Sequence, residues 1–232
     1  GQNGSVIDNE GQINIASSKA VNTSAVFGIY GNSAEINNNG GITMVISGAA
    51  DSYGIYLAGR GSNTLTNNAT VKVNRSSAYA EGKKAVALYA ENGSINNSGA
   101  LEVGAKDAVI NGGIGIETDG GNVTNGGTIT VYGNGSAIKA ADGSITNNAS
   151  ATVYGNGSVL NGQNGNVTNN EKGQLNIYTD GKASAYGIYL AGSTGNTITN
   201  KASIFINRYG AYAQAASTGN YGIWTDNAKI VN

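Results

Sequence analysis

The hydrophobic positions of this chain recur in a long repeat. An aliphatic residue, one variable residue and an Asn follow one another nine times, and successive copies are 22 to 32 residues apart, about 28 on average. Asn stands at the same offset in every copy, which chance does not produce even in an Asn-rich chain. The nine repeated Asn are Asn9, Asn38, Asn67, Asn97, Asn125, Asn147, Asn169, Asn200 and Asn232.

Each repeat carries two further apolar positions. The second follows the first by six residues in most repeats and lies within a period-two alternation, as in Val71-Lys72-Val73. Such alternation is typical of a strand with one buried face. The third position, usually preceded by Gly or Ala, runs from Ile29 in the first repeat to Ile223 in the last. No segment shows a convincing helical period with caps.

Three short strands per repeat, with Gly and Asn at the corners, predict one coil of a parallel β-helix. A single coil cannot bury its own apolar face, but stacked coils can, and stacking aligns equivalent residues about 4.8 Å apart. We therefore expect a single all-β domain over residues 1–232. Its expected fold is a right-handed parallel β-helix, or β-solenoid, of about eight coils with three short strands each, the hand following the general preference of parallel crossovers.

The repeated Asn predicts a structural ladder. Asn tolerates the left-handed backbone conformation that a sharp corner needs. Stacked Asn side chains also hydrogen-bond to their copies above and below. We expect the nine Asn to stabilise the fold and not to bind a ligand.

Coil length varies mainly between the second and third apolar positions, so most insertions leave from one corner. The longest insertions are residues 16–27, 74–86 and 207–221, and the last two share an Asn-Arg start followed by Tyr. One hypothesis treats these loops as neutral decoration. The other makes them contacts with a ligand or a cell, because Arg and Tyr are enriched at interface hot spots. The candidate contacts are Arg75, Tyr79, Arg208, Tyr209 and Tyr212.

Aromatic residues also recur at outward positions of neighbouring coils. Three tyrosines lie three residues after a second apolar position and are expected to stack outside: Tyr132, Tyr154 and Tyr178. Another column follows the third apolar position, and Glu117 and Lys139 in its middle can pair. Such ladders either stabilise neighbouring strands or form a platform for sugar rings or a partner protein. The aromatic members of this second column are Tyr30, Tyr56, Tyr89, Tyr189 and Trp224.

Composition narrows the classes of function. The chain has 37 Gly and 34 Asn but no Pro, Cys or His. Without Cys and His there can be no disulfide, thiolate-bound zinc, Ser-His-Asp triad or HExxH site. The absence of Pro suits central strands, which need every N–H. A formal net charge of −1 argues against a surface for nucleic acid or anionic membrane.

The acidic residues do not predict catalysis. Carbohydrate-active enzymes need clustered carboxylates, whereas the 14 Asp and Glu are scattered. Asp119 and Asp142 fall at one corner of adjacent coils and could bind Ca²⁺ together with carbonyl groups and Asn. We expect no enzyme activity and no cofactor. The outward Thr column is too interrupted for an ice-binding face.

The units GSITNNASATVY at residues 143–154 and SYGIY at residues 52–56 recur in variants along essentially the whole chain. These units resemble the passenger repeats of type V autotransporter adhesins of Gram-negative bacteria. The resemblance implies display at the bacterial cell surface, anchorage through a C-terminal outer-membrane barrel absent from this chain, and roles in adhesion, aggregation or biofilm formation. It implies as partners a host or bacterial surface protein or glycan, or copies of the chain, with no nucleic acid and no direct membrane insertion.

The chain stops midway through a ninth repeat and shows no caps. An open β-helix end can pair with another chain. We therefore expect either a longer natural protein, of which this is a segment, or head-to-tail stacking of copies. The alternative functions are a subunit of an extracellular filament and a carbohydrate-active β-helix.

Overall fold

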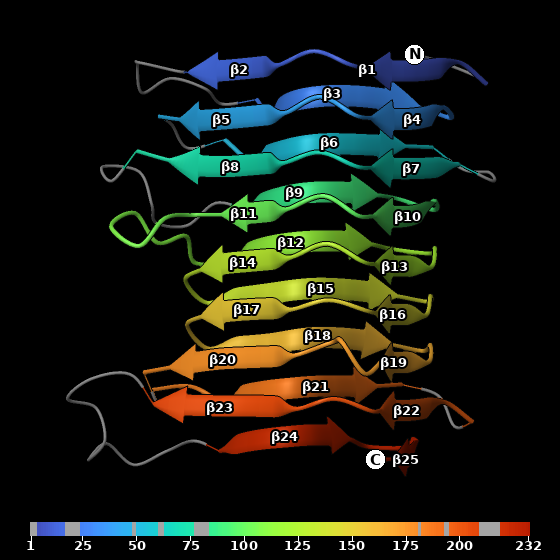
Figure 1. The fold of residues 1–232 in the computed structure, drawn as a ribbon, viewed down its shortest axis with the longest axis vertical. Helices are drawn as coiled ribbons and strands as arrows, with labels where there is room; N and C mark the ends of the chain where they lie inside the picture. Colours follow the sequence, from blue (N-terminus) through green and yellow to red (C-terminus); the bar gives the residue numbers. More distant parts are fainter. Residues whose placement is uncertain are drawn as a thin grey trace.

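The computed structural model is a stack of strand-built coils (Figure 1). It describes residues 4–16, 24–47, 50–59, 63–76, 84–180, 182–192, 195–208 and 219–232. Every third strand returns to the same parallel sheet, and the two termini lie at opposite ends of the stack. The expected right-handed parallel β-helix of about eight coils is confirmed. Across the described ranges, no helix is long and apolar enough to cross a membrane.

Three sheets make up the fold. The first sheet contains β1 (Val6–Asn9), β4 (Glu35–Asn38), β7 (Thr64–Asn67), β10 (Ser94–Asn97), β13 (Val123–Asn125), β16 (Ile145–Asn147), β19 (Val167–Asn169), β22 (Thr197–Asn200) and β25 (Lys229–Val231). The second sheet contains β2 (Ile13–Ala16), β5 (Ile42–Ile46), β8 (Val71–Arg75), β11 (Leu101–Val103), β14 (Ile129–Tyr132), β17 (Ala151–Tyr154), β20 (Leu175–Thr179) and β23 (Ile204–Arg208). The third sheet contains β3 (Val26–Asn32), β6 (Ser52–Ala58), β9 (Ala85–Ala90), β12 (Gly113–Thr118), β15 (Gly135–Ala141), β18 (Gly157–Gln163), β21 (Ala185–Ala191) and β24 (Asn220–Thr225).

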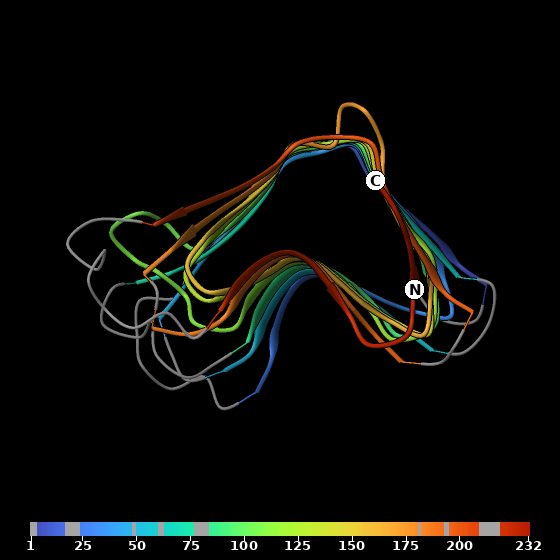
Figure 2. The same cartoon turned by 90° about the horizontal axis from the view of Figure 1, so that it is seen from below.

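Parallel pairing keeps equivalent residues in register from coil to coil. Ile95 of β10 pairs with Leu65 on one side and Val123 on the other, so the first apolar position forms a continuous column. These inward columns are fully buried over most of the stack and merge into one core. Seen along the axis, the coils superimpose at the sheets and diverge at the corners (Figure 2). Variation in coil length is therefore absorbed outside the core.

The nine repeated Asn form an unbroken ladder inside the first sheet. The Nδ2 of each donates to the Oδ1 of the Asn in the next coil, at 2.6 to 2.9 Å, over all eight steps. Several also donate to the carbonyl oxygen two residues further on, as from Asn125 to Gly127 at 2.8 Å. From Asn38 to Asn200 the ladder is buried. The expected Asn column is thus present, with its amides paired in both directions.

The ladder Asn are expected to adopt a left-handed backbone conformation at the corners, and this expectation is wrong. Outside glycine, the described residues adopt a positive φ only at Ser33, Asp142 and Asn164, each three residues before a first apolar position. None of the ladder Asn is among them. The ladder instead depends on the amide side chain, which is a donor and an acceptor at once.

Glycine before the third apolar position lets two sheets approach each other. The third sheet bends toward the second in its middle (Figure 2). A Cβ added to Gly54 would lie 2.5 Å from Cγ1 of Val71 and 2.6 Å from the carbonyl oxygen of Ala87. A Cβ on Gly187 would collide in the same way with Cγ2 of Ile204. β-Branched side chains of the second sheet fill the space that these glycines leave.

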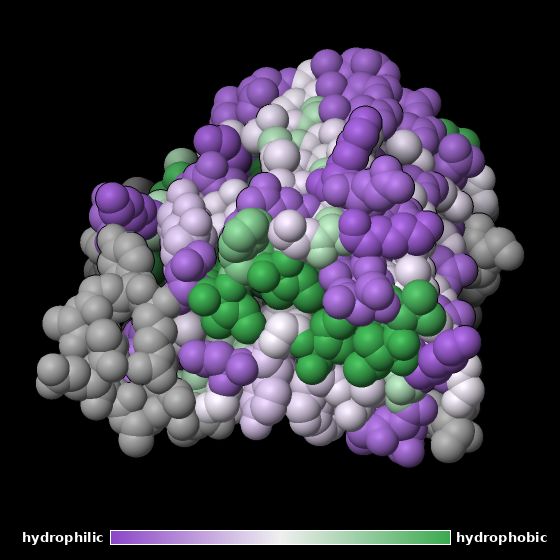
Figure 3. Space-filling model, turned by 60° about the horizontal axis from the view of Figure 1, so that its bottom comes forward, coloured by the Kyte–Doolittle hydropathy of each residue, from purple (hydrophilic) through white to green (hydrophobic). Residues whose placement is uncertain are grey.

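The ends of the stack expose part of the apolar core. Figure 3 shows apolar side chains framed by polar ones at the C-terminal end. Ile230 of β25, at the first apolar position, is 47 % exposed there, and Ile7 of β1 is only partly buried at the N-terminal end. Residues that are fully buried in the middle of the stack, such as the first apolar position, therefore become partly accessible in the terminal coils.

Replacing Asn147 and Asn169 together with Ala should destabilise the protein, because buried amide groups of the neighbouring coils lose their partners. Each substitution should lower the free energy of unfolding by about 1–3 kcal/mol, measured by chemical denaturation. The matched control replaces Asn148 and Asn170, whose half-buried side chains are bonded at 2.7 Å in the adjacent column. Equal losses in both double variants would contradict a special role for the buried ladder.

Gly54→Ala should lower the free energy of unfolding by about 1–3 kcal/mol, because the new methyl group overpacks the contact between the second and third sheets. Gly222→Ala is the matched control, since a Cβ at this last glycine of the column would meet no atom within 4 Å. Thermal or chemical denaturation of both variants provides the measurement. A Gly54→Ala variant as stable as the parent chain would show that the close approach is unimportant.

Candidate functional site: outward aromatic residues and a tyrosine-lined cleft

The second aromatic column lies outside the third sheet, at the predicted register positions. Tyr30, Tyr56 and Tyr89 pair in succession through β3, β6 and β9, and Tyr189 pairs with Trp224 through β21 and β24. Tyr30 is 45 % exposed, Tyr89 is only 7 % exposed, and the other three are half-buried. Tyr189 and Trp224 stack with ring centroids 4.5 Å apart and planes 3° apart. The column therefore forms two separate aromatic groups.

The hydroxyl groups of Tyr56 and Tyr89 are held by carboxylates. Tyr56 donates to Glu91 at 3.0 Å, and Tyr89 donates to Asp119 at 2.5 Å. Burial, followed by these hydrogen bonds, raises the pKa of both hydroxyls. Tyr53 packs against both rings, and burial raises its pKa to about 12. Tyr89 belongs to this packing layer, so the prediction of an exposed contact at Tyr89 is wrong.

Arg75 is buried at the end of β8. Only 2 % of it is exposed, and its guanidinium donates to the carbonyl oxygens of Ala50 and Lys84 and to the hydroxyl of Ser52. Burial lowers the pKa of Arg75, and the charge of Asp51 opposes this shift. Arg75 ties the segments leading into β6 and β9 to the second sheet. The prediction of a ligand contact at this residue is therefore wrong.

The remaining loop contacts lie outside what the structure describes. Tyr79, Tyr209 and Tyr212 fall outside the described residues. Arg208 ends β23, where its backbone pairs in register with Thr179, but its side chain is also outside the described part. The proposed contact roles of these four residues stay predictions.

An ion cluster separates the two aromatic groups of the third sheet. Glu117, which is 2 % exposed, lies 3.0 Å from the Nζ of Lys139 and 2.5 Å from that of Lys84. The pair with Lys139 is the one expected from the repeat. The Nζ of Lys84 also lies 5.3 Å from the ring centroid of Tyr89. These contacts link successive coils.

The acids considered for Ca²⁺ binding make separate contacts. Asp119 accepts from Tyr89, whereas Asp142 accepts from the Nδ2 of Asn164 at 2.8 Å. Within the part of the chain that the structure describes, no three acidic, His or Cys side chains are grouped so that they could hold a metal ion. The geometry therefore gives Asp119 and Asp142 individual roles at the corner of the coil.

A cleft of about 620 Å³ lies outside the corner where β14, β17 and β20 end. Its floor is the stack of Tyr132, Tyr154 and Tyr178, which the sequence predicted. The ring centroids are 4.9 and 4.8 Å apart, with interplanar angles of 7° and 12°. Tyr154, in the middle, is 38 % exposed. Other residues lining the cleft include Lys106, Val109, Asn111, Asn134 and Asp180.

One wall of the cleft is the loop between β11 and β12. Residues 105–108 form a tight turn closed by two backbone hydrogen bonds of 3.0 Å. The buried Ile110 anchors the loop, and its N–H donates to the carbonyl of Tyr132 at 2.8 Å. Gly133, with φ of 117°, allows this close approach because a Cβ there would collide with the backbone of Ile110. The exposed Val109 is thus held beside the tyrosines.

Polar side chains form the rim of the cleft. The N–H of Asn156 donates to the Oδ1 of Asn134 at 2.8 Å, and the Nδ2 of Asn156 donates to Asp180 at 2.7 Å. The hydroxyl of Thr179 also donates to Asn156. The rim therefore combines amides with one carboxylate, and the loop adds the cation of Lys106.

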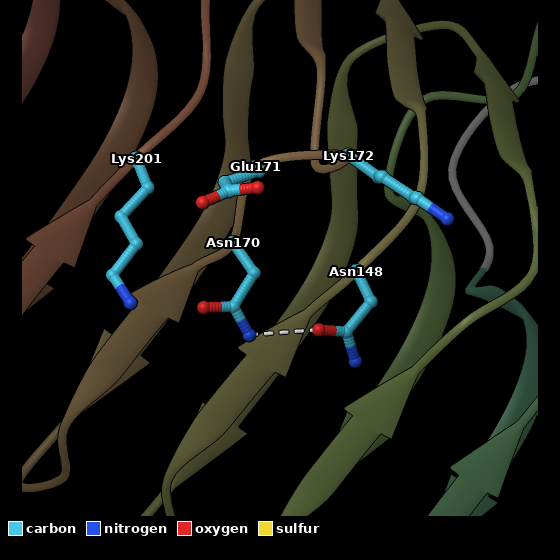
Figure 4. A pocket seen from close by; sticks show the side chains of 5 residues that line it. All are labelled: Asn148, Asn170, Glu171, Lys172 and Lys201. Carbon is cyan, nitrogen blue, oxygen red and sulfur yellow. Dashed lines mark hydrogen bonds between the residues drawn. The ribbon is translucent and has the colours of Figure 1, made fainter.

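A smaller hollow of about 250 Å³ lies between the first and second sheets (Figure 4). Asn170 donates to Asn148 at 2.7 Å across its floor, and Glu171, Lys172 and Lys201 complete it. A turn at residues 170–174 creates the hollow and explains the longer first-to-second spacing in this coil. Because no aromatic or aliphatic side chain lines it, it is a poorer binding site than the cleft.

The sequence predicts the tyrosine stack but not the cleft around it. Lys106, Val109 and Asn111 reach the corner through a loop whose course depends on the burial of Ile110. The signal available in the sequence is coil length: 15 residues separate the second and third apolar positions in this coil, against nine in each of the next two.

The carboxyl of Asp180, at the rim of the cleft, makes the stability of the folded chain depend on pH. Burial alone would raise its pKa, but hydrogen bonds from the N–H of Lys182 at 2.9 Å and from Asn156, with the charge of Lys182, lower it. A pKa lowered by folding stabilises the folded chain above the unfolded-state value of about 4. That stabilisation is lost as the pH falls through the lower folded-state pKa.

We expect the free energy of unfolding of the parent chain to fall more steeply between about pH 5 and about pH 3 than that of Asp180→Asn. The amide of the variant cannot titrate, so the difference isolates this carboxyl. Chemical denaturation at a series of pH values measures both curves. Parallel curves would show that the hydrogen bonds to Asp180 contribute nothing to stability.

Comparisons of the whole chain with family models, with curated proteins and with solved structures each gave no significant match. Function must therefore be inferred from the described side chains and from the repeats. Among the described residues, the tyrosine-lined cleft brings accessible aromatic rings together with several polar groups.

Proposed function

We propose that this chain is a non-enzymatic β-helical module of a cell surface that mediates adhesion, aggregation or biofilm formation. The observation that carries the proposal is the cleft, where three aligned tyrosines meet amide groups on a rigid stack. Clefts that combine aromatic side chains with a few placed polar groups are typical of binding sites. Tyr is also enriched among residues that dominate binding energy.

The groups in the cleft favour binding over catalysis. Hydrolysis of a glycosidic bond ordinarily needs two carboxyl groups on either side of that bond. Asp180 is the one carboxylate among the described residues that line the cleft. Its pKa is lowered, so it remains ionised near neutral pH and is a poor general acid.

The place of action and the partner rest on the resemblance of the repeats to autotransporter passengers. That resemblance supports display at a bacterial cell surface and, as partner, a surface protein, a glycan or a copy of the chain. The register of the three sheets supports the same role, because a continuous core gives a stiff support that presents its corner loops at fixed intervals.

The test uses beads coated with the purified chain. We expect them to adhere to epithelial or bacterial cells, and Tyr154→Ala to reduce the number bound under flow several-fold, because an exposed aromatic contact is lost. Thr152→Ala, another outward position of β17, is the matched control and should leave adhesion unchanged. Thermal denaturation of each variant shows whether the fold is kept.

Two outcomes would favour the alternatives. New reducing ends released from polysaccharides by the parent chain would identify a carbohydrate-active enzyme. Light scattering that grows with the concentration of the isolated chain, without adhesion to cells, would identify a filament subunit. Parent beads that adhere to no cell type would contradict the proposal directly.

A further inference from the structure

We infer that the tyrosine-lined cleft binds a short, extended, neutral oligosaccharide laid parallel to the helix axis, with one sugar residue per coil. The inference rests on the proposed function, because it names the class of ligand for the same cleft. It is carried by three observations: the spacing of the tyrosines, the uncovered part of their rings and the balance of charge around them.

The spacing of the tyrosines matches the repeat of an extended sugar chain. Tyr132 and Tyr154 occupy paired positions in β14 and β17, and Tyr178 continues the stack from β20. Successive ring centroids are 4.9 and 4.8 Å apart. One step is close to the length of one β-linked hexopyranose residue in an extended chain. A ligand running along the axis therefore meets the same aromatic contact at each sugar.

The stacked rings keep part of their surface accessible to a ligand. Their planes are nearly parallel, but centroid distances near 5 Å are those of offset stacking, not of complete face-to-face overlap. Tyr154, between two neighbours, is still 38 % exposed, so the stack leaves part of this side chain accessible. The C–H groups of a pyranose can pack on such partly open rings while its hydroxyl groups point to the rim.

The rim supplies the polar partners of a neutral ligand. Asn134 accepts one hydrogen bond through Oδ1 and keeps its Nδ2 as a donor for a sugar hydroxyl, and Asn111 offers a second amide. Lys106 on the loop and Asp180 beyond Tyr178 give the cleft one charge of each sign. A strongly anionic or cationic ligand would gain little from this balance.

The backbone around the cleft does not suit an extended peptide. Peptides that bind as an added strand need an open sheet edge. β14, β17 and β20 are each paired on both sides, so they offer no such edge. Specificity in this mode also comes from pockets for alternate side chains, whereas the floor of this cleft is a row of like aromatic rings.

Isothermal titration calorimetry of the full chain with cellobiose, cellotriose and cellohexaose, and with chitotriose in parallel, tests the inference. Affinity for the cello-oligosaccharides should rise from the disaccharide to the trisaccharide and change little for the hexasaccharide, because three tyrosines span three coils. Saturable binding of chitotriose with the same dependence on Tyr154 also supports the inference. Affinity that is independent of length would overturn it.

Variants locate the binding on the molecule. Tyr154→Ala should weaken trisaccharide binding about tenfold, whereas Tyr154→Phe, which keeps the ring, should change it less than about threefold. Val109→Arg changes an exposed wall residue, leaves the core intact and should weaken binding by obstruction. Tyr189→Ala, in the stack with Trp224 on the third sheet, is the matched control and should have no effect.

The outcomes separate this inference from the proposed function. If beads adhere through Tyr154 but no neutral oligosaccharide binds, the proposed function stands and the glycan inference is wrong. Saturable binding of an extended peptide, lost in Tyr154→Ala, would also overturn it. Unchanged sugar affinity in both Tyr154→Ala and Val109→Arg would show that any binding occurs outside the cleft, and it would refute the inference.

Discussion

The buried Asn ladder is the interaction on which the rest of the structure depends. An amide that donates to one neighbouring coil and accepts from the other is satisfied only when successive coils stand in register. A slip of one residue would turn the amides outward and bury unmatched side chains in their place. The ladder therefore keeps equivalent residues in register from coil to coil, although the repeats differ in length. The apolar columns supply the burial, and the Asn column specifies the alignment.

Fixed register converts scattered residues into continuous columns. Tyr132, Tyr154 and Tyr178 are separated by more than 20 residues each, yet their rings stand in contact because their strands are paired. The same alignment brings Glu117 beside Lys139. Insertions change the loops at the corner without disturbing these columns. The tyrosine floor of the candidate site thus follows from the pairing of the strands, whereas its wall and rim are formed by particular corner loops.

The sequence was informative wherever structure follows from period and pairing. It predicts the fold, the Asn column and the outward positions of Tyr30, Tyr56 and Trp224, because each depends only on the repeat. It does not predict the burial of Arg75, since that depends on two carbonyl groups that meet the guanidinium, that of Ala50 in the preceding coil and that of Lys84 before β9. The wall of the cleft was missed for the same reason, because the fold of that loop depends on the buried Ile110.

The two short coils have a consequence for how such a protein can diverge. Each is 22 residues long, and their corner segments, VYGNGS at residues 131–136 and 153–158, are identical. Outside these segments the two coils differ at most positions, yet the same columns pass through both. An in-frame gain or loss of one such unit would keep every column continuous and add or remove one tyrosine from the row. The length of the row is therefore open to adjustment by copy number, without any change to the residues that form it.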